Sequence, residues 1–405
     1  MVAARAEVVA ARSGRQRAQK WRQEVVRGDR RHARAKTMQV GCKKSAAVEW
    51  GEVMPDNKAK IYMIGPSLKT QGGISSVLEI YNRSFQNELN LSFIASYSGK
   101  NRILDVLYFA SALFRVFFIS IFAAQPIFHI HVASKGSYLR KSILAGICMA
   151  FRHKTILHVH GAMFDQFIEN SPQRGRSKIV RLFNRADRVV VLSEYWYSYF
   201  EKLVPKEKLL IIYNPTSTYQ SGFVKAYRKS GIQILFMGRL GQRKGVYDLL
   251  QAAARLRGID FSLHLYGDGE LNRVREMVKS KGLQDIIKVG SWVPHSKINE
   301  LYENADIMVL PSYAEGLPMS LLEAVGKGLP IVSTKVGGIP EIVEEGRNGF
   351  LVEPGDIESL ADRIRVLLTA PELIEQMGKQ SLAIAKAKFS VEKIRLQLEE
   401  LYRQL

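Results

Sequence analysis

The chain has 405 residues, too many for one ordinary hydrophobic core, so two domains are expected. Its 46% hydrophobic residues are typical of a folded soluble protein, and its net charge of +21 predicts an anionic partner: a membrane surface, a phosphorylated ligand or a nucleic acid. Cys42 and Cys148 share no metal-type spacing and suggest no disulfide framework, so a reducing, cytoplasmic compartment is expected.

Residues 1–58 carry fourteen Lys and Arg against six Asp and Glu, a net charge of +8. The segment lacks the apolar core of a secretory signal and shows no clear fold pattern. It is therefore predicted to be a basic, disordered extension. Its charge also suggests nucleic-acid binding, but aromatic residues interleaved with basic ones are not found, so no nucleic-acid partner is expected.

Short apolar runs then alternate with helical segments. Strands are predicted at residues 60–64, 127–132, 155–159, 188–192 and 209–213, and helices at 74–87, 138–151 and 176–185. This alternation favours a parallel sheet covered on both faces. Residues 59–213 are predicted to form an N-terminal Rossmann-like domain.

Residues 103–124 form the most apolar run of the chain, interrupted by Asp105 and Arg115. Three interpretations are open for it. It is a helix buried in the domain, a helix that docks on a membrane surface, or a membrane span, for which about 20 nearly uninterrupted apolar residues are needed.

The alternation restarts after a polar segment, residues 214–230, which is predicted to be a linker. Strands are predicted at 232–237, 262–266, 286–289, 307–310, 331–334 and 349–352, with a helix near 357–368. We expect a second Rossmann-like domain over 231–388 and a final amphipathic helix over 389–405. Because ligands bind beyond the carboxyl ends of parallel strands, the expected site is the cleft between the two domains.

The segment from Tyr313 to Ala324 follows a predicted strand and opens a helix near Pro318. Proline suits a first helical turn, where backbone N–H groups are not needed by the helix. The N–H groups at Met319 and Ser320, with the helix dipole, predict a diphosphate site. Glu315 and Glu323 can accept hydrogen bonds from sugar and ribose hydroxyls. An acidic residue at an ordinary helix start is the structural alternative.

Two further loops end strands of the second half. Residues 236–245 carry Arg239 and Lys244, which can reach a diphosphate as a planar fork and as a point charge. Gly267 and Gly269 flank Asp268 and would let a ligand lie against the backbone, although Gly-Asp-Gly is also an ordinary turn.

The first half offers weaker signals. Gly72 and Gly73 precede a helix and resemble an anion cradle, but their spacing is not the dinucleotide fingerprint. His160 ends a strand, where both a functional and a structural role are open. His129, His131, His158 and His160 form two i, i+2 pairs, which favour core packing over metal binding. Since no Asp-x-Asp pair is present, no metal and no other cofactor are expected.

Glu315-x7-Glu323, with Gly-Arg239…Lys244-Gly upstream and Gly337-Gly338-Ile-Pro-Glu341 downstream, resembles family 4 of the retaining glycosyltransferases. The resemblance covers roughly residues 60–400. It implies the GT-B architecture: two Rossmann-like domains facing across a cleft, with the donor mostly on the second and a C-terminal helix that crosses back to the first.

The resemblance also implies roles for individual residues. Arg239 and Lys244 would bind the donor diphosphate, Glu315 the transferred sugar, and Glu323 the ribose. His160 would contact the donor sugar near the reaction centre and, with Glu315, Arg239 and Lys244, makes up the catalytic set. The remaining donor-binding residues would be Gly72, Gly73, Gly267, Val293, Gly316, Leu317, Pro318, Met319 and Ser320.

The expected reaction is retaining transfer of a hexosyl unit from a nucleoside diphosphate sugar to a hydroxyl of a glycan or lipid-linked acceptor, as in cell-surface polysaccharide synthesis. The alternative is another sugar-nucleotide enzyme of this fold, an epimerase or a phosphorylase. The basic first half and residues 103–124 predict peripheral contact with an anionic membrane, which places the protein in the cytoplasm at the inner face of the cytoplasmic membrane.

Overall fold

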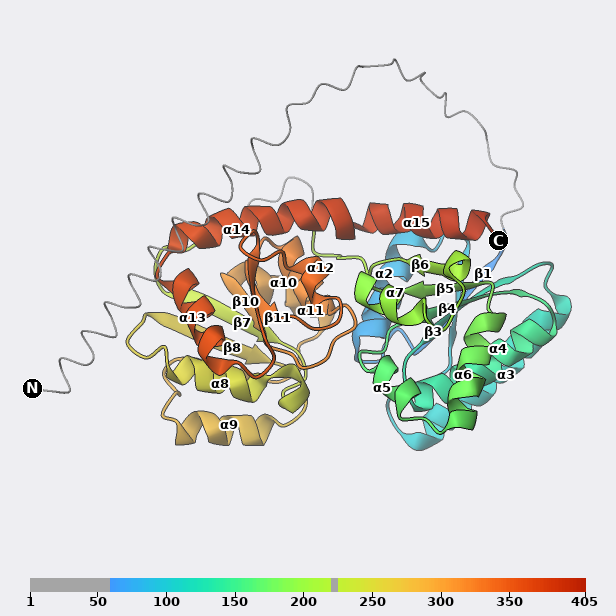
Figure 1. Ribbon diagram of the computed structural model, residues 1–405, viewed down its shortest axis with the longest axis horizontal. Helices are drawn as coiled ribbons and strands as arrows, with labels where there is room; N and C mark the ends of the chain where they lie inside the picture. The colour runs from blue at the N-terminus through green and yellow to red at the C-terminus, as the bar shows by residue number, and fades with distance from the viewer. Residues whose placement is uncertain (1–58, 220–224) are drawn as a thin grey trace, which may run out of the picture. The chain divides into compact units, whose positions relative to one another are not determined.

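The computed structural model describes residues 59–219 and 225–405, apart from the side chains of His295 and Ser296. The predicted basic extension, residues 1–58, lies outside the described residues. Two six-stranded parallel sheets make up the described part (Figure 1), as the sequence predicts. Their strands are near-continuous apolar runs because helices cover both faces of each sheet.

The first sheet has the strand order β2-β1-β3-β4-β5-β6, all parallel. Its strands are β1 (Ile61–Gly65), β2 (Leu91–Ala95), β3 (Ile127–Val132), β4 (Lys154–Val159), β5 (Arg188–Val191) and β6 (Leu209–Ile211). Its helices are α2 (Gly73–Phe85), α3 (Arg102–Phe122), α4 (Gly136–Ala150), α5 (Phe164–Glu169), α6 (Gln173–Arg185), α7 (Glu194–Phe200) and the short η1 (Lys206–Lys208). Its topological switch point lies between β1 and β3.

The second sheet has the order β12-β11-β10-β7-β8-β9, the doubly wound Rossmann order, with its switch point between β7 and β10. Its strands are β7 (Ile232–Met237), β8 (Phe261–Tyr266), β9 (Ile287–Gly290), β10 (Ile307–Leu310), β11 (Ile331–Thr334) and β12 (Gly349–Val352). Its helices are η2 (Gln242–Lys244), α8 (Val246–Ala254), α9 (Leu271–Ser280), α10 (His295–Asn304), α11 (Met319–Gly326), α12 (Ile339–Ile342), α13 (Ile357–Leu368) and α14 (Pro371–Ile384).

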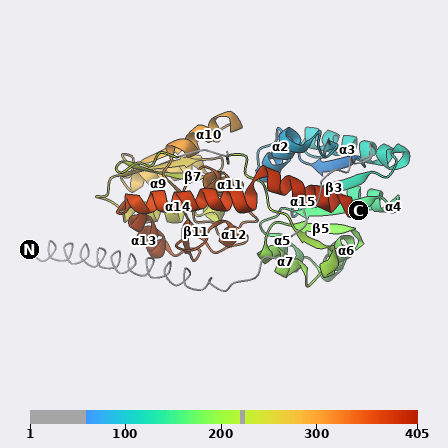
Figure 2. The ribbon, with the colours of Figure 1, turned by 90° about the horizontal axis from the view of Figure 1, so that it is seen from above.

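The chain end returns to the first half. A π-helical turn, η3 (Ala385–Phe389), joins α14 to α15 (Val391–Arg403), which Figure 2 shows lying across the first sheet. Tyr402 of α15 contacts His129 of β3 with 2.8 Å between the hydroxyl and Nδ1. Arg395 pairs with Glu88 at 3.1 Å. These contacts tie the last helix to the first half.

Two features differ from the sequence-based expectation. Asn214, Thr216, Thr218 and Lys225 of the predicted linker are buried, whereas residues 226 and 228–230 are exposed. The Thr218 hydroxyl donates to the Glu323 carbonyl at 2.7 Å, which gives these polar side chains partners within the fold. Residues 220–224 lie outside the described residues.

Helix α3 is not a buried helix either. Only Ala112, Val116 and Ser120 are buried, and the other apolar side chains of α3 are exposed or only partly covered. In the described residues it is the one helix long and apolar enough to cross a membrane, by length and composition alone. The interpretation of residues 103–124 as a core helix is therefore wrong.

Candidate functional site

The candidate site lies where the switch points of the two sheets meet. Gly72 and Gly73 follow β1, and the loop leading to Met319 follows β10. A Cβ atom placed on Gly73 would lie 3.7 Å from Cγ of Met319. The structure thus brings together a loop from each half that the sequence singles out. Switch points are where open α/β sheets bind ligands.

Two helix starts face this point without a side-chain cap. Helix α11 begins at Met319 with Pro318 as its N-cap residue, and α2 begins at Gly73 with Gly72 as its N-cap residue. Pro318 therefore precedes the helix instead of occupying its first turn, because its ψ of 121° is extended. Uncapped N-terminal N–H groups attract anions. The arrangement suits a diphosphate between the halves.

Glu315 and Lys244 form a buried ion pair beside these helix starts. The Lys244 ammonium donates to Glu315 Oε1 at 2.5 Å, and the Ser312 hydroxyl donates to the same oxygen at 2.7 Å. Both side chains are largely buried: that of Lys244 is 14% exposed and that of Glu315 is 6% exposed. The two predicted catalytic residues, 71 positions apart, thus share one site, and each satisfies the other's charge.

Glycines place the Glu315 loop. Gly337 has a left-handed φ of +52°, and a Cβ there would collide with the Glu315 carbonyl oxygen. The Gly338 N–H donates to the Gly316 carbonyl at 2.8 Å. A Cβ on Gly316 would lie 3.2 Å from the His160 carbonyl oxygen, so the first half also contacts this loop. Gly337 and Gly338 therefore fix the position of the loop that carries Glu315.

Glu323 is buried in α11. The Tyr302 hydroxyl donates to Oε2 of Glu323 at 2.9 Å, and the Ser320 carbonyl oxygen lies 3.1 Å from the same hydroxyl. Burial raises the pKa of the Glu323 carboxyl to about 7, an effect that the Tyr302 hydrogen bond partly opposes. The carboxyl is therefore about half protonated at neutral pH in the free protein.

This pKa predicts a pH-dependent donor affinity. A carboxylate accepts ribose hydroxyls better when it is ionised, so donor binding should release a proton. The donor KM should fall about tenfold from pH 6 to pH 8, as the ionised fraction of Glu323 rises. Steady-state kinetics from pH 6 to pH 8 on the parent and on Glu323→Gln test this prediction, and a parent donor KM that does not vary with pH would contradict it.

The same carboxyl affects stability. Because its pKa in the folded protein lies above the ordinary value, the free protein should lose stability as pH rises from about 4.5 to about 7.

The remaining donor-side residues are more open. Arg239 is 69% exposed, and its guanidinium lies 3.9 Å from the Asp268 carboxylate. Val293 is half-buried and Trp292 is exposed in the loop between β9 and α10. A Cβ on Gly267 would collide with the Gly238 carbonyl oxygen, so this glycine is needed for packing between two loops. That packing is a structural reason for Gly267 that the sequence does not show.

His160 belongs to a group of four histidines on β3 and β4. Its Nε2 lies 2.8 Å from His131 Nδ1, and His129 Nε2 lies 3.0 Å from His158 Nδ1. Burial lowers the pKa of His129 and of His160 to about 3, so both are neutral at pH 7. His160 can therefore act there as a neutral hydrogen-bonding group and not as a cation.

Three of these histidines come close enough to raise the question of a metal. Nitrogens of His129, His131 and His158 lie within 4.8 Å of one another. Both ring nitrogens of His129 and of His131 already have partners, including Tyr402 and Met63. Among the described residues, only Nε2 of His158 in this trio is buried without a partner. This pattern favours a hydrogen-bonded network, and the absence of a metal stays a prediction.

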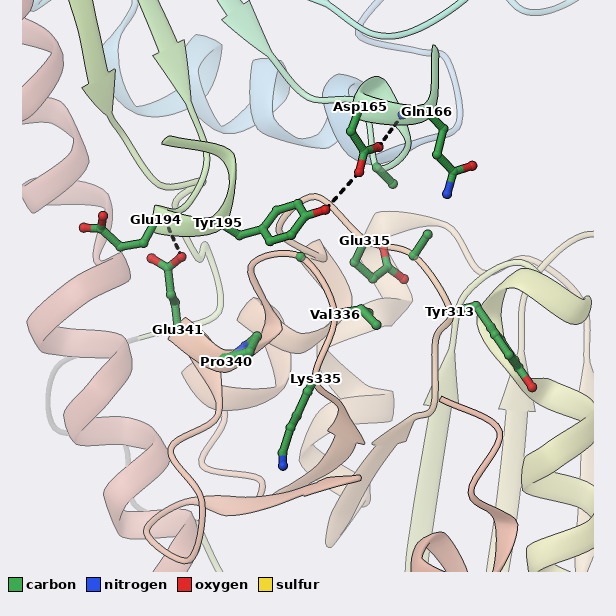
Figure 3. Close-up of a pocket in the computed structure, with 13 residues that line it drawn as sticks. Asp165, Gln166, Glu194, Tyr195, Tyr313, Glu315, Lys335, Val336, Pro340 and Glu341 are labelled. Carbon is green, nitrogen blue, oxygen red and sulfur yellow. Dashed lines mark hydrogen bonds between the residues drawn. The ribbon is translucent and has the colours of Figure 1, made fainter. Parts of the chain in front are cut away.

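A cavity of about 470 Å³ lies next to Glu315, lined by residues of both halves (Figure 3). Asp165 and Tyr195 line it from the first half, and the Tyr195 hydroxyl donates to Asp165 Oδ2 at 2.9 Å. Tyr313, Glu315 and Lys335 line it from the second half. The sequence motifs do not include Asp165, Tyr195 or Lys335. All three follow the carboxyl ends of strands, β4, β5 and β11, and that position is the signal that could have found them.

Comparisons with known proteins agree with this geometry. Residues 222–383 match the family model "Glycosyl transferases group 1". The chain is 30% identical over 196 residues to the "Putative colanic acid biosynthesis glycosyltransferase WcaL" of Escherichia coli (strain K12), which covers 45% of this chain and 48% of that protein. The chain thus spans about half the length of this curated relative.

Two solved structures share the fold. Sucrose-phosphate synthase from Thermosynechococcus elongatus matches with a TM-score of 0.71 and 18% identity, over 85% of this chain and 98% of that chain. HepE from Anabaena, in complex with UDP-glucose, matches with a TM-score of 0.68 and 21% identity, over 85% of this chain and 100% of that chain. At these identities the likeness shows the fold alone. The expected GT-B architecture is confirmed.

Proposed function

We propose that the protein is a retaining hexosyltransferase, because residues 222–383 match the glycosyl transferases group 1 family model and the two sheets have the GT-B fold. It transfers a hexosyl unit from a nucleoside diphosphate sugar to a hydroxyl of a glycan or lipid-linked acceptor, in polysaccharide synthesis. The observation that carries the proposal is the meeting of Gly73 and Met319 beside the Lys244–Glu315 pair.

In the proposed reaction the bond from the anomeric carbon to the diphosphate breaks, and the diphosphate leaves with the electron pair. The acceptor oxygen bonds to the anomeric carbon from the same face and gives its proton to a leaving-group oxygen. Arg239, Lys244 and the N–H groups at the starts of α2 and α11 stabilise the developing negative charge. No metal or other cofactor is part of the proposal.

In this proposal Glu315 does not act as a nucleophile. Its Oε1 accepts hydrogen bonds from Lys244 and Ser312, which stabilise the carboxylate and lower its reactivity. Its negative charge favours the positive, oxocarbenium-like sugar of the transition state, and its free oxygen accepts from sugar hydroxyls. When the donor binds, Lys244 is shared between Glu315 and the diphosphate.

We assign the cavity next to Glu315 to the acceptor, because Asp165 and Tyr195 present a carboxylate and an aromatic ring at its far side. Asp165→Asn should raise the acceptor KM by about tenfold. This factor corresponds to the lower end of the free energy of a hydrogen bond to a charged group. Hydrolysis of the donor in the absence of acceptor should not change. Glu169→Gln, on the same short helix and exposed, is the matched control. An unchanged acceptor KM for Asp165→Asn would remove the acceptor from this cavity.

The function is tested by incubating the protein with UDP-, GDP- and ADP-hexoses and simple glycan acceptors, followed by NMR spectroscopy. The proposal predicts a new glycosidic anomeric proton with the configuration of the donor. Inversion at the anomeric carbon would contradict retention. An isomerised donor without transfer would identify an epimerase, and sugar phosphate formed from glycan and phosphate would identify a phosphorylase.

We also propose that the protein works in the cytoplasm, at the inner face of the cytoplasmic membrane. The support is chemical. The Cys148 thiol is free and buried, as in reducing compartments, and the first half exposes an apolar helix beside basic residues. Cell fractionation tests the location, and recovery of the native protein in neither the cytoplasmic nor the cytoplasmic-membrane fraction would contradict it.

A further inference from the structure

Helix α3 separates its buried and exposed residues cleanly. Ala112, Val116 and Ser120 recur every fourth position and face the sheet. The opposite side of the helix carries residues spaced by four or seven positions, which fall on one face of an α-helix. Phe117 contacts both Phe118 and Phe151, the residue that follows α4. Together these residues form what we call the apolar surface: Ile103, Leu107, Phe114, Phe117, Phe118, Phe122 and Phe151.

The apolar surface is continuous and strongly exposed. Ile103, Phe114 and Phe122 are 75%, 67% and 76% exposed. Ring contacts link the centre of the surface, with Phe114 and Phe118 at 4.7 Å and Phe118 and Phe122 at 6.0 Å between ring centroids. Apolar patches of this kind on soluble proteins mark binding surfaces.

The structure excludes a membrane span for α3 in this fold. The helix is the crossover between β2 and β3, two parallel strands of one sheet, so its two ends cannot lie on opposite sides of a bilayer while the sheet is intact. The Asp105 carboxylate accepts from the Ser98 and Gly99 N–H groups at its start. His153 Nε2 bonds the Ser120 carbonyl near its end at 2.9 Å.

A basic helix lies on the same side of the sheet. The connections β2-α3-β3, β3-α4-β4 and β4-α6-β5 all run in one direction along the sheet, so right-handed crossovers place their helices on one face (Figure 1). Helix α4 packs against both α3 and α6. The outward face of α6 has no acidic residue and carries Arg174, Lys178, Arg181 and Arg185.

We propose that α3 and α6 dock this protein peripherally on an anionic lipid bilayer. The apolar surface enters the boundary between headgroups and acyl chains, and the basic helix α6 meets the lipid phosphates. A second copy of the chain fits less well, because two basic helices would repel each other across a symmetric interface. The docking rests on the proposed function and deepens it. Helix α6 follows closely after Asp165, which lines the cleft, so a lipid-linked acceptor would be presented at the cleft from the membrane.

The test is flotation of the full chain with vesicles of phosphatidylcholine, with and without phosphatidylglycerol. The parent should float with the anionic vesicles, and less at high salt. Phe114→Ser, Phe118→Ser and Phe122→Ser combined should lower binding at least about tenfold, since burying one phenylalanine is worth about that factor. Arg174→Gln, Lys178→Gln and Arg181→Gln combined should lower it roughly fivefold per residue.

The control variants keep the basic segment 1–58 and change exposed apolar or basic residues outside α3 and α6. Leu396→Ser, at 52% exposed on α15, and the pair Arg275→Gln and Lys279→Gln on α9 should float like the parent. All variants should transfer sugar to a water-soluble acceptor at the parent rate, which separates this proposal from the proposed function.

Four outcomes would overturn the docking. The parent could stay unbound with anionic vesicles, or the phenylalanine variant could float as well as the parent. The same variant could convert a dimer into a monomer on size-exclusion chromatography, which would make the surface a contact between copies. Resistance of the membrane-bound parent to alkaline carbonate would identify an integral span instead.

Discussion

Replacing Glu315 by glutamine should lower kcat/KM for transfer by about 10²–10³-fold while the protein stays folded, a loss typical of one preorganised electrostatic group. The substitution keeps the size of the side chain and its hydrogen bond from Ser312. It removes the negative charge that favours the positively charged sugar and that neutralises the Lys244 ammonium. Initial rates over a range of donor concentrations measure the effect.

Two further variants separate catalysis from stability in that experiment. The double variant Glu315→Gln and Lys244→Met removes both charges, so it should recover part of the thermal stability that the single change loses, without recovering activity. Glu276→Gln, an exposed carboxylate on α9, should behave like the parent. Full activity in Glu315→Gln would show that Glu315 does not contact the transferred sugar.

Arg239→Ala should raise the donor KM by roughly 10- to 150-fold, the range for a lost hydrogen bond to a charged group. Arg239 is exposed and only loosely associated with Asp268, so its removal should cost little stability. Arg275→Ala, an exposed arginine on α9, controls for the loss of one surface charge. Donor kinetics for Arg239→Ala equal to those of the control would mean that the diphosphate does not reach this loop.

Much of the fold follows from short apolar runs, because strands buried on both faces need continuous apolar residues. The strand β2, Leu91–Ala95, is not among the predicted strands; Ser92 interrupts its apolar run, and at the sheet edge three of its five residues are only partly buried. Helix α3 shows a different difficulty. Its apolar content is the same for a core helix and for a surface helix, and only the neighbours in the fold decide which side chains are covered.

In the candidate site, too, some features can be predicted from the sequence and others depend on the folded neighbours. Loop motifs at the carboxyl ends of β7 and β10 point to Arg239, Lys244 and Glu315 because those positions carry function in this architecture. Their pairing cannot be seen in the sequence, because Lys244 and Glu315 are 71 residues apart and meet only across the switch point. The hydrogen bond that partly opposes the raised pKa of Glu323 also comes from another helix, from Tyr302.

Calorimetric titration of the full chain with nucleoside diphosphates and the matching monophosphates tests the central claim most directly. The uncapped starts of α2 and α11 with Arg239 and Lys244 predict that one diphosphate binds at least about tenfold more tightly than its monophosphate, and that Arg239→Ala removes most of this difference. Equal affinity for the two ligands, or no binding of UDP, GDP and ADP, would contradict a diphosphate site between the two halves.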